Sequence, residues 1–228
     1  MEPGQIEEIK GRYRKHATSY DTARRASDWL RPLAIARLGL KPGETVLDLG
    51  CGTGLSFELL QQGVGPEGRI IGVELSPDML AVARGKVVEQ GWTNVTLIEG
   101  SVEEAALPKL VDAVLTFFTP EIAISDQAMS KALAALGPEG RLVAAGVKRA
   151  EGWWGIFFNL FFQFRYRTWR WVGAKGVARR LWGGEQPYTV LERMVGSLER
   201  RDYMGHCAYI AYARNGRSDP SSDKEIAR

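Results

Sequence analysis

Residues 46–55 read Val-Leu-Asp-Leu-Gly-Cys-Gly-Thr-Gly-Leu, and this stretch decides the fold. Its first half is a short apolar run, which is typical of a strand buried on both faces. Its second half places glycine at every other position, directly before a segment with helical spacing that starts near Ser56. Glycine lets the backbone turn sharply and lets a ligand approach closely, while a helix N-terminus offers free N–H groups. The stretch therefore predicts a strand, a ligand-binding loop and a helix.

Similar apolar runs recur along the chain and alternate with helical segments. We expect further strands at residues 69–74, 95–99, 111–117 and 141–147. Helical spacing lies between them, first in Met79, Ala83 and Val87, and later in Met129, Ala132, Leu133 and Leu136. Residues 137–140, Gly-Pro-Glu-Gly, predict a turn into the fifth strand. Strict alternation of strand and helix predicts an α/β fold with a Rossmann-like, doubly wound, mostly parallel sheet.

The alternation breaks after residue 147. Residues 189–198 have the pattern of a helix, and residues 199–213, with Gly205 near the middle, have that of a hairpin that closes the sheet. We therefore expect seven strands, the final one antiparallel. Residues 214–228 lack periodicity and predict a disordered tail.

A chain of 228 residues fits one domain. We expect a single domain over residues 1–213. Its parts are a helical N-terminal arm at residues 1–40, a ligand-binding core at residues 44–147, and an aromatic and basic insertion at residues 150–185.

The composition is that of a soluble globular protein, with 45% hydrophobic and 25% charged residues and a formal charge of +3. The two cysteines, Cys51 and Cys207, form no C-x-x-C pair, so we expect neither disulfides nor a bound metal. The polar N-terminus lacks the features of a secretory signal, which favours a cytoplasmic protein. The most apolar stretch, residues 153–164, is interrupted by Asn159 and Gln163 and is shorter than the roughly 20 residues of a membrane span.

The motif at residues 46–55 resembles that of class I S-adenosylmethionine-dependent methyltransferases, in which an acidic residue precedes a G-x-G-x-G loop. The resemblance implies that the amino acid part of S-adenosylmethionine lies over the loop, with Asp48 contacting its ammonium group directly or through water. The loop residues that it would cover are Gly50, Cys51, Gly52 and Gly54. The alternatives are a glycine-rich turn without a ligand and a dinucleotide site. The dinucleotide motif G-x-G-x-x-G needs its third glycine where Leu55 stands, which disfavours NAD.

The second expected strand ends in a carboxylate, Glu74, at the edge where an α/β sheet binds its ligand. The resemblance implies that Glu74 accepts hydrogen bonds from the ribose hydroxyls, with Leu75 and Met79 beside it. The alternative is a solvated glutamate followed by a helix cap at Ser76.

Two further segments complete the resemblance. After the third strand, many family members carry an aspartate where this chain has Ser101, and the resemblance assigns the adenine contact to Ser101 and the Val102 backbone. Residues 116–120, Thr-Phe-Phe-Thr-Pro, should face the methyl donor, which adds Phe117 to the site. They lack the Asn-Pro-Pro-Tyr or Asp-Pro-Pro-Tyr pattern of enzymes that methylate amino groups of nucleic acids, so we expect no nucleic acid partner.

Residues 13–21 are similar to the Tyr-Asp arm that precedes the first strand in ubiquinone and menaquinone methyltransferases. This resemblance implies that Tyr20 covers the cofactor. The alternative is an amphipathic helix that packs Tyr13 and Tyr20 on the sheet.

Aromatic residues are dense in residues 152–182, and the six basic residues from Arg165 to Arg180 have no acid among them. The segment resembles, in position, one of bacterial phospholipid N-methyltransferases. Three roles stay open: a lid over an apolar acceptor, a peripheral contact with a membrane surface, and a homodimer interface.

Together the motifs predict an enzyme that transfers the methyl group of S-adenosylmethionine to a small, hydrophobic or lipid-like acceptor. In-line positioning alone can accelerate such a transfer, so we nominate no catalytic base, neither His16 nor His206. Two alternatives remain: transfer of the aminocarboxypropyl group of the same cofactor, and a non-catalytic binding protein. The protein is expected to be a monomer or a homodimer.

Overall fold

The computed structural model describes residues 28–149, 186–204 and 207–215, together with Gly4, Glu7, Lys10, Gly11, Arg14, Tyr20 and Asp21. The expectations for the insertion at residues 150–185, for His16 and His206, and for the tail beyond residue 215 lie outside the described residues.

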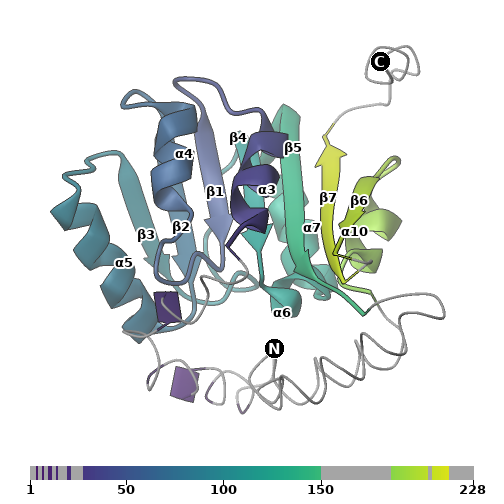
Figure 1. The fold of residues 1–228 in the computed structure, drawn as a ribbon, viewed down its shortest axis with the longest axis horizontal. Helices are drawn as coiled ribbons and strands as arrows, with labels where there is room; N and C mark the ends of the chain where they lie inside the picture. Colours follow the sequence, from purple (N-terminus) through teal and green to yellow (C-terminus); the bar gives the residue numbers. More distant parts are fainter. Residues whose placement is uncertain are drawn as a thin grey trace.

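Seven strands form one sheet in the order β3-β2-β1-β4-β5-β7-β6 (Figure 1). They are β1 (Thr45–Leu49), β2 (Arg69–Glu74), β3 (Val95–Glu99), β4 (Val111–Phe117), β5 (Leu136–Val147), β6 (Glu199–Tyr203) and β7 (Ala208–Arg214). Strand β7 runs antiparallel to both of its neighbours, and the other pairs are parallel. The predicted fold class is confirmed.

The strand order reverses between β1 and β4, which lie side by side at the centre of the sheet. In doubly wound sheets the ligand binds outside the carboxyl ends of the strands at such a switch point. The loop after β1 begins there, so the topology places the glycine motif where a ligand is expected.

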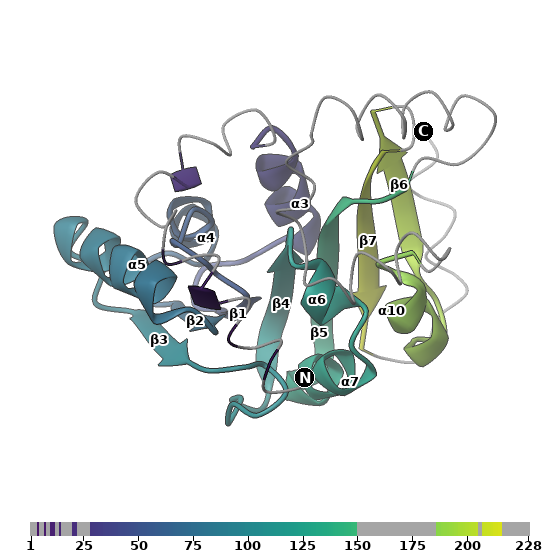
Figure 2. The same ribbon diagram turned by 90° about the horizontal axis from the view of Figure 1, so that it is seen from below.

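Helices cover both faces of the sheet. They are α3 (Leu30–Leu38), α4 (Phe57–Val64), α5 (Pro77–Glu89), α6 (Pro120–Ala123), α7 (Asp126–Ala135) and α10 (Thr189–Met194). Figures 1 and 2 show α3, α4 and α5 on one face and α7 and α10 on the other. Each side has its own buried apolar cluster: Leu30, Phe57 and Leu80 belong to the first, and Met129, Ala132 and Leu191 to the second.

Two of the helices begin directly after a serine that caps the first turn. Ser76 precedes α5, and its Oγ accepts a hydrogen bond from Met79 N at 3.4 Å, while Pro77 occupies the first turn. Ser125 caps α7 in the same way, accepting from Ala128 N at 3.3 Å. Both residues satisfy an N–H group that the first helical turn leaves without a partner.

Three element boundaries differ from those predicted. The expected tail at residues 214–228 begins too early, because Arg214 is the last residue of β7 and pairs with Arg141. Leu136 begins β5 instead of ending the preceding helix, because its backbone is extended and pairs with Val111. The predicted turn at residues 137–140 thereby falls within β5, where the register shifts between Val111 and Ala113. Helix α10 ends at Met194, earlier than predicted, since Val195 is extended and Gly196 and Ser197, both poor helix formers, follow.

In the described part of the chain, every helix falls short of the length and apolarity that crossing a bilayer requires.

Candidate functional site

The loop after β1 is built on three glycines with left-handed backbones: Gly50 (φ 72°), Gly52 (φ 56°) and Gly54 (φ 75°). A side chain at Gly50 would collide with Thr119, and one at Gly54 would lie 2.7 Å from the ring of Phe57. At Gly52 the nearest atom is Met79 Cε, at 3.5 Å. Gly50 and Gly54 are therefore required by the packing of the protein itself, whereas Gly52 borders open space.

Asp48 lies at the end of β1 with only 1% of its surface exposed. Its Oδ2 atom has no hydrogen-bond partner among the described residues. Burial raises the pKa of this carboxyl to about 7; Arg31 and a hydrogen bond with Ser56 act to lower it, and Glu74 acts to raise it. A buried carboxylate oxygen without a hydrogen-bond partner is costly, so a positive charge brought close to Asp48 would stabilise its charged form.

Glu74, at the end of β2, is 8% exposed and holds the glycine loop. Its Oε2 accepts a hydrogen bond from Gly52 N at 3.0 Å, and its Oε1 accepts one from Ser76 N at 2.8 Å. Burial raises the pKa of Glu74, while these N–H groups act to lower it. The alternative of a solvated glutamate is therefore wrong.

Two adjoining hollows open at this edge of the sheet. One, the aspartate cavity, is lined by Asp48, Cys51 and other residues that include Arg31, Thr53, Leu55 and Ser56. The other, the glutamate cavity, is lined by Glu74, Leu75, Met79, Ser101 and Val102, among others. Both are lined by Tyr20, Gly50, Gly52, Phe117 and Phe118.

The structure thus brings together every predicted site residue except Gly54, which lines neither cavity. Cys51 is buried, and its pKa is raised well above the usual value by burial and by Asp48 and Glu74, so its thiol stays protonated. In the described residues, no cluster of three or more His, Cys, Asp or Glu side chains could hold a metal ion.

Several lining residues were not named among the predicted site residues, although Phe118 and Thr119 belong to residues 116–120, which were expected to face the methyl donor. Phe118 follows β4 with a left-handed backbone (φ 57°), and its ring meets that of Phe117 edge to face at 4.8 Å between centroids. Thr119, Glu121 and Ile122 enter the glutamate cavity from the short helix α6 and the residue before it. The Thr-Pro pair at residues 119–120, a cap residue before a proline, was the available signal for α6.

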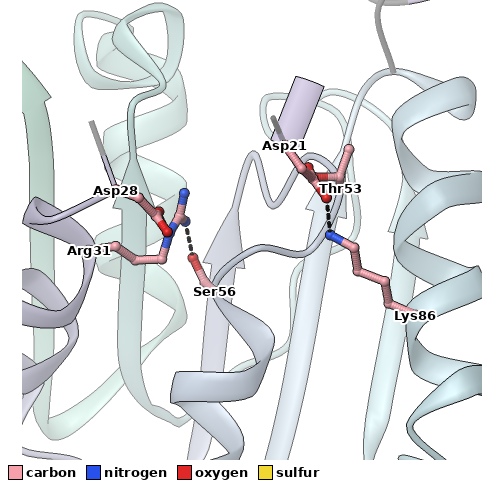
Figure 3. Close-up of polar contacts among 6 residues, drawn as sticks. All are labelled: Asp21, Asp28, Arg31, Thr53, Ser56 and Lys86. Carbon is pink, nitrogen blue, oxygen red and sulfur yellow. Dashed lines mark hydrogen bonds and ion pairs between the residues drawn. The ribbon is translucent and has the colours of Figure 1, made fainter. Parts of the chain in front are cut away.

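The segment that carries Tyr20 is bound to the glycine loop through its neighbour Asp21 (Figure 3). Thr53 Oγ1 donates to Asp21 Oδ1 at 2.5 Å, and Lys86 Nζ, from α5, lies 2.6 Å from Asp21 Oδ2. These contacts hold Tyr20 beside both cavities.

Arg31, in the first turn of α3, approaches the loop from the other side (Figure 3). Its Nε donates to Asp28 Oδ1 and its Nη1 to Ser56 Oγ, each at 2.7 Å. Its guanidinium carbon lies 4.4 Å from the centre of the Phe117 ring. No motif in the sequence marks this residue.

Known proteins resemble the chain in sequence and in fold. Residues 40–154 match the family model described as "Methyltransferase domain". The chain is 28% identical over 150 residues to demethylmenaquinone methyltransferase of Listeria monocytogenes, which covers 58% of this chain and 62% of that protein. It is 44% identical over 71 residues to arsenite methyltransferase of Halobacterium salinarum, which covers 31% of this chain and 18% of that protein. The chain thus spans less than two thirds of the length of both relatives.

Among solved structures, the chain is similar to a SAM-dependent methyltransferase from Aquifex aeolicus, with a TM-score of 0.59 and 19% sequence identity. The superposition covers 94% of this chain and 99% of that one. At this level of identity the likeness concerns the fold.

Proposed function

Because this chain belongs to the methyltransferase domain family, whose cofactor is S-adenosylmethionine, we propose that it transfers the methyl group of that cofactor to a small hydrophobic acceptor. The observation that carries the proposal is the pair of adjoining cavities at the switch point, one with a buried aspartate and one with a buried glutamate.

We assign one end of the cofactor to each cavity on the chemistry of the lining residues. Asp48 Oδ2, buried and without a partner among the described residues, would accept from the ammonium group. Glu74 would accept from the ribose hydroxyls through lone pairs that the N–H groups of Gly52 and Ser76 leave free. Ser101 and the Val102 backbone, which line the same cavity, would border the adenine. When bound, S-adenosylmethionine supplies a methyl group on a positively charged sulfur.

The residues shared by both cavities surround the place where they meet. Tyr20, Phe117 and Phe118 give this junction aromatic walls, and Gly50 and Gly52 form its floor without side chains. Aromatic walls exclude water and hold an apolar acceptor in a fixed orientation, which can contribute a large part of the rate without an acid or base.

We place a quinol-like ring first among the acceptor classes to be tested. The relatives named demethylmenaquinone methyltransferase support this choice, as do the aromatic walls at the junction. An aromatic acceptor can pack against these rings. The nature of the acceptor atom, peripheral contact with a membrane, and the monomeric or dimeric state stay predictions.

The experiment incubates purified protein and S-adenosylmethionine with quinols, phenols, lipids, amines and thiols, and identifies the products by mass. Methyl transfer yields S-adenosylhomocysteine, a proton and an acceptor in which a methyl group replaces a hydrogen. Methylthioadenosine as the product would instead show transfer of the aminocarboxypropyl group. Absence of S-adenosylmethionine binding in calorimetry would overturn the proposal as a whole.

A further inference from the structure

A residue with a left-handed backbone lies at each end of β4: Leu110 (φ 61°) precedes the strand and Phe118 (φ 57°) follows it. This conformation is disfavoured for bulky side chains. Leu110 is 73% exposed and lines neither cavity, whereas Phe118 lines both. Residues with such strained backbones persist only where the surrounding structure fixes them, and they gather at functional sites. The strain at Phe118 therefore lies where a ligand is expected, and Leu110 offers a comparison outside the site.

The contacts on either side of Phe118 fix its backbone. Its N–H group donates to Ala145 O of β5 at 2.8 Å. The next residue, Thr119, forms a hydrogen bond with Thr116 through the two Oγ1 atoms, and it packs against Gly50, where a side chain would collide with it. Between these contacts the chain leaves β4 and enters α6. The left-handed backbone thus keeps Phe118 at the junction of the two cavities.

Phe117 and Phe118 form an aromatic corner at this junction. Their rings meet edge to face, with 4.8 Å between centroids and an angle of 61° between planes. Phe117 is only 7% exposed, and the guanidinium of Arg31 covers one face of its ring. Phe118 is half-buried. Of the two rings, that of Phe118 therefore offers more surface to a second ligand beside the cofactor.

We propose that Phe118 selects the acceptor, with its ring packing against a flat aromatic ring of the acceptor where the two cavities meet. The proposal rests on the proposed function, since the acceptor has to bind beside the methyl donor. Aromatic rings attract each other in offset-stacked or edge-to-face arrangements by more than the area they bury. A saturated ring of similar size lacks this attraction. Phe118 therefore favours aromatic acceptors over saturated ones.

A structural role is the competing explanation, because Phe118 also packs against the apolar cluster that contains Leu30 and Phe57. If the ring only fills space there, its removal affects every ligand of the site alike. A contact with the acceptor predicts a different result: the preference for aromatic ligands falls, and the affinity for the cofactor product stays nearly the same.

The test uses two bicyclic alcohols of similar size as acceptor probes: 2-naphthol, which is flat and aromatic, and its saturated analogue decahydro-2-naphthol. Calorimetry measures the affinity of each probe for the protein saturated with S-adenosylhomocysteine. Phe118→Leu removes the ring but keeps an apolar side chain, and Phe118→Gly removes the ring and relieves the left-handed backbone. Leu110→Gly is the matched control, because it relieves the same backbone conformation at the other end of β4, outside both cavities. Melting temperatures check that the variants are folded.

The wild type should bind 2-naphthol more tightly than the saturated analogue. This preference should fall by about two- to tenfold in both Phe118→Leu and Phe118→Gly, which corresponds to the loss of one aromatic pair. Their affinities for S-adenosylhomocysteine should stay within about threefold of that of the wild type. Leu110→Gly should keep both the preference and the affinity of the wild type.

An unchanged preference in the two Phe118 variants would overturn the proposal, as would a loss of S-adenosylhomocysteine affinity as large as the loss for 2-naphthol. A wild type that binds 2-naphthol no better than the saturated analogue would overturn it as well. A wild type that binds neither S-adenosylhomocysteine nor methylthioadenosine would instead overturn the proposed function itself. The two failures are thus distinguishable in one series of titrations.

Discussion

Gly52 and Gly54 share a left-handed backbone but have different surroundings, which allows a matched test of the loop. Each change to alanine carries a similar backbone cost, about 1 to 2 kcal/mol. At Gly54 the new methyl group would also press on the buried ring of Phe57, whereas at Gly52 it would enter space that lines both cavities. Gly52→Ala should thus mainly reduce ligand affinity, and Gly54→Ala mainly stability.

We expect Gly52→Ala to weaken S-adenosylhomocysteine binding more than about tenfold, or about 1.4 kcal/mol, in calorimetry. Gly54→Ala should lose a further 1 to 3 kcal/mol or so of unfolding free energy in urea titrations, which is typical of overpacking. Equal effects of the two changes on affinity would show that Gly52 does not border the ligand.

Glu74 combines two roles that a ligand series can separate. Glu74→Ala should weaken S-adenosylhomocysteine binding on the order of ten- to a hundredfold, because a charged acceptor is lost. It also removes the acceptor for Gly52 N, so the loop itself loosens. Comparing adenosine with 2′,3′-dideoxyadenosine isolates the ribose contact: the wild type should prefer adenosine, and the variant should not. A preference that survives the change would remove Glu74 from the ribose site.

The residues around the cavities differ in how far the sequence could predict them. Asp48, the glycines and Glu74 lie at strand ends and in the loop that follows, so their positions follow from the alternation of strands and helices. Arg31 reaches the site only through the packing of α3 on the sheet. Phe118 lies in the segment expected to face the methyl donor, but no local pattern specifies its left-handed backbone. Tertiary contacts of this kind leave no trace in periodicity.

Helices and strands also differ in how far the sequence predicts them. The central strands were predictable because both of their faces are buried, which makes each a continuous apolar run, as in β4. Leu136 was misplaced because one apolar residue fits both the helical spacing of α7 and the buried face of β5. Element type was therefore easier to predict than element boundaries.

The segment with Tyr20 is an element whose attachment to the domain can be tested. Asp21 bonds both Thr53, which is buried, and Lys86, which is partly exposed. Asp21→Asn removes the negative charge that pairs with Lys86 and so weakens the attachment of the segment that carries Tyr20. Because Tyr20 borders both cavities, we expect faster release of S-adenosylhomocysteine in stopped-flow measurements. Partly exposed pairs are worth at most about 1 kcal/mol, so the acceleration should be about two- to fivefold.

Salt provides the control for this prediction. Exposed charges are screened over about 10 Å at 0.1 M ionic strength, so wild-type release should quicken with salt and that of Asp21→Asn should change less. Asp126→Asn breaks an exposed ion pair with Arg193, neither of which lines a cavity, and should leave release unchanged. Identical rates for the wild type and Asp21→Asn at low salt would contradict a role of Asp21 in holding Tyr20 over the ligand.

At the scale of the whole molecule, the buried charge of Asp48 connects ligand binding to folding stability. Burial raises the pKa of Asp48 from 3.8 to about 7, so the folded protein without ligand holds a proton that the unfolded chain releases near pH 4. The stabilisation from this group is complete below about pH 4 and is lost as the pH rises through about 7. Above that pH the folded protein carries a buried charge without a hydrogen bond at Oδ2.

Asp48→Asn should therefore stabilise the ligand-free protein at pH 8 relative to the wild type, and much less at pH 5. The gain should be roughly 1 to 4 kcal/mol, because each unit of pKa shift corresponds to about 1.4 kcal/mol. Urea titrations of both proteins at the two pH values measure it. If the difference in unfolding free energy between Asp48→Asn and the wild type is equal at pH 5 and pH 8, the burial of Asp48 does not raise its pKa.

Binding of S-adenosylhomocysteine should favour the wild type over Asp48→Asn, which is the reverse of the order expected for the ligand-free proteins. An ammonium group beside Asp48 favours the carboxylate, so S-adenosylhomocysteine binding by the wild type should tighten as the pH rises towards 8, with release of a proton below about pH 7. At a concentration of about 100 times its Kd a ligand adds about 2.7 kcal/mol of stability, and tighter binding adds more. At a fixed concentration, S-adenosylhomocysteine should thus raise the melting temperature of the wild type more at pH 8 than at pH 5.5, while Asp48→Asn should show a small shift at both. A wild-type shift that is the same at both pH values would mean that the ammonium group does not bind at Asp48, even if the cofactor binds elsewhere in the site.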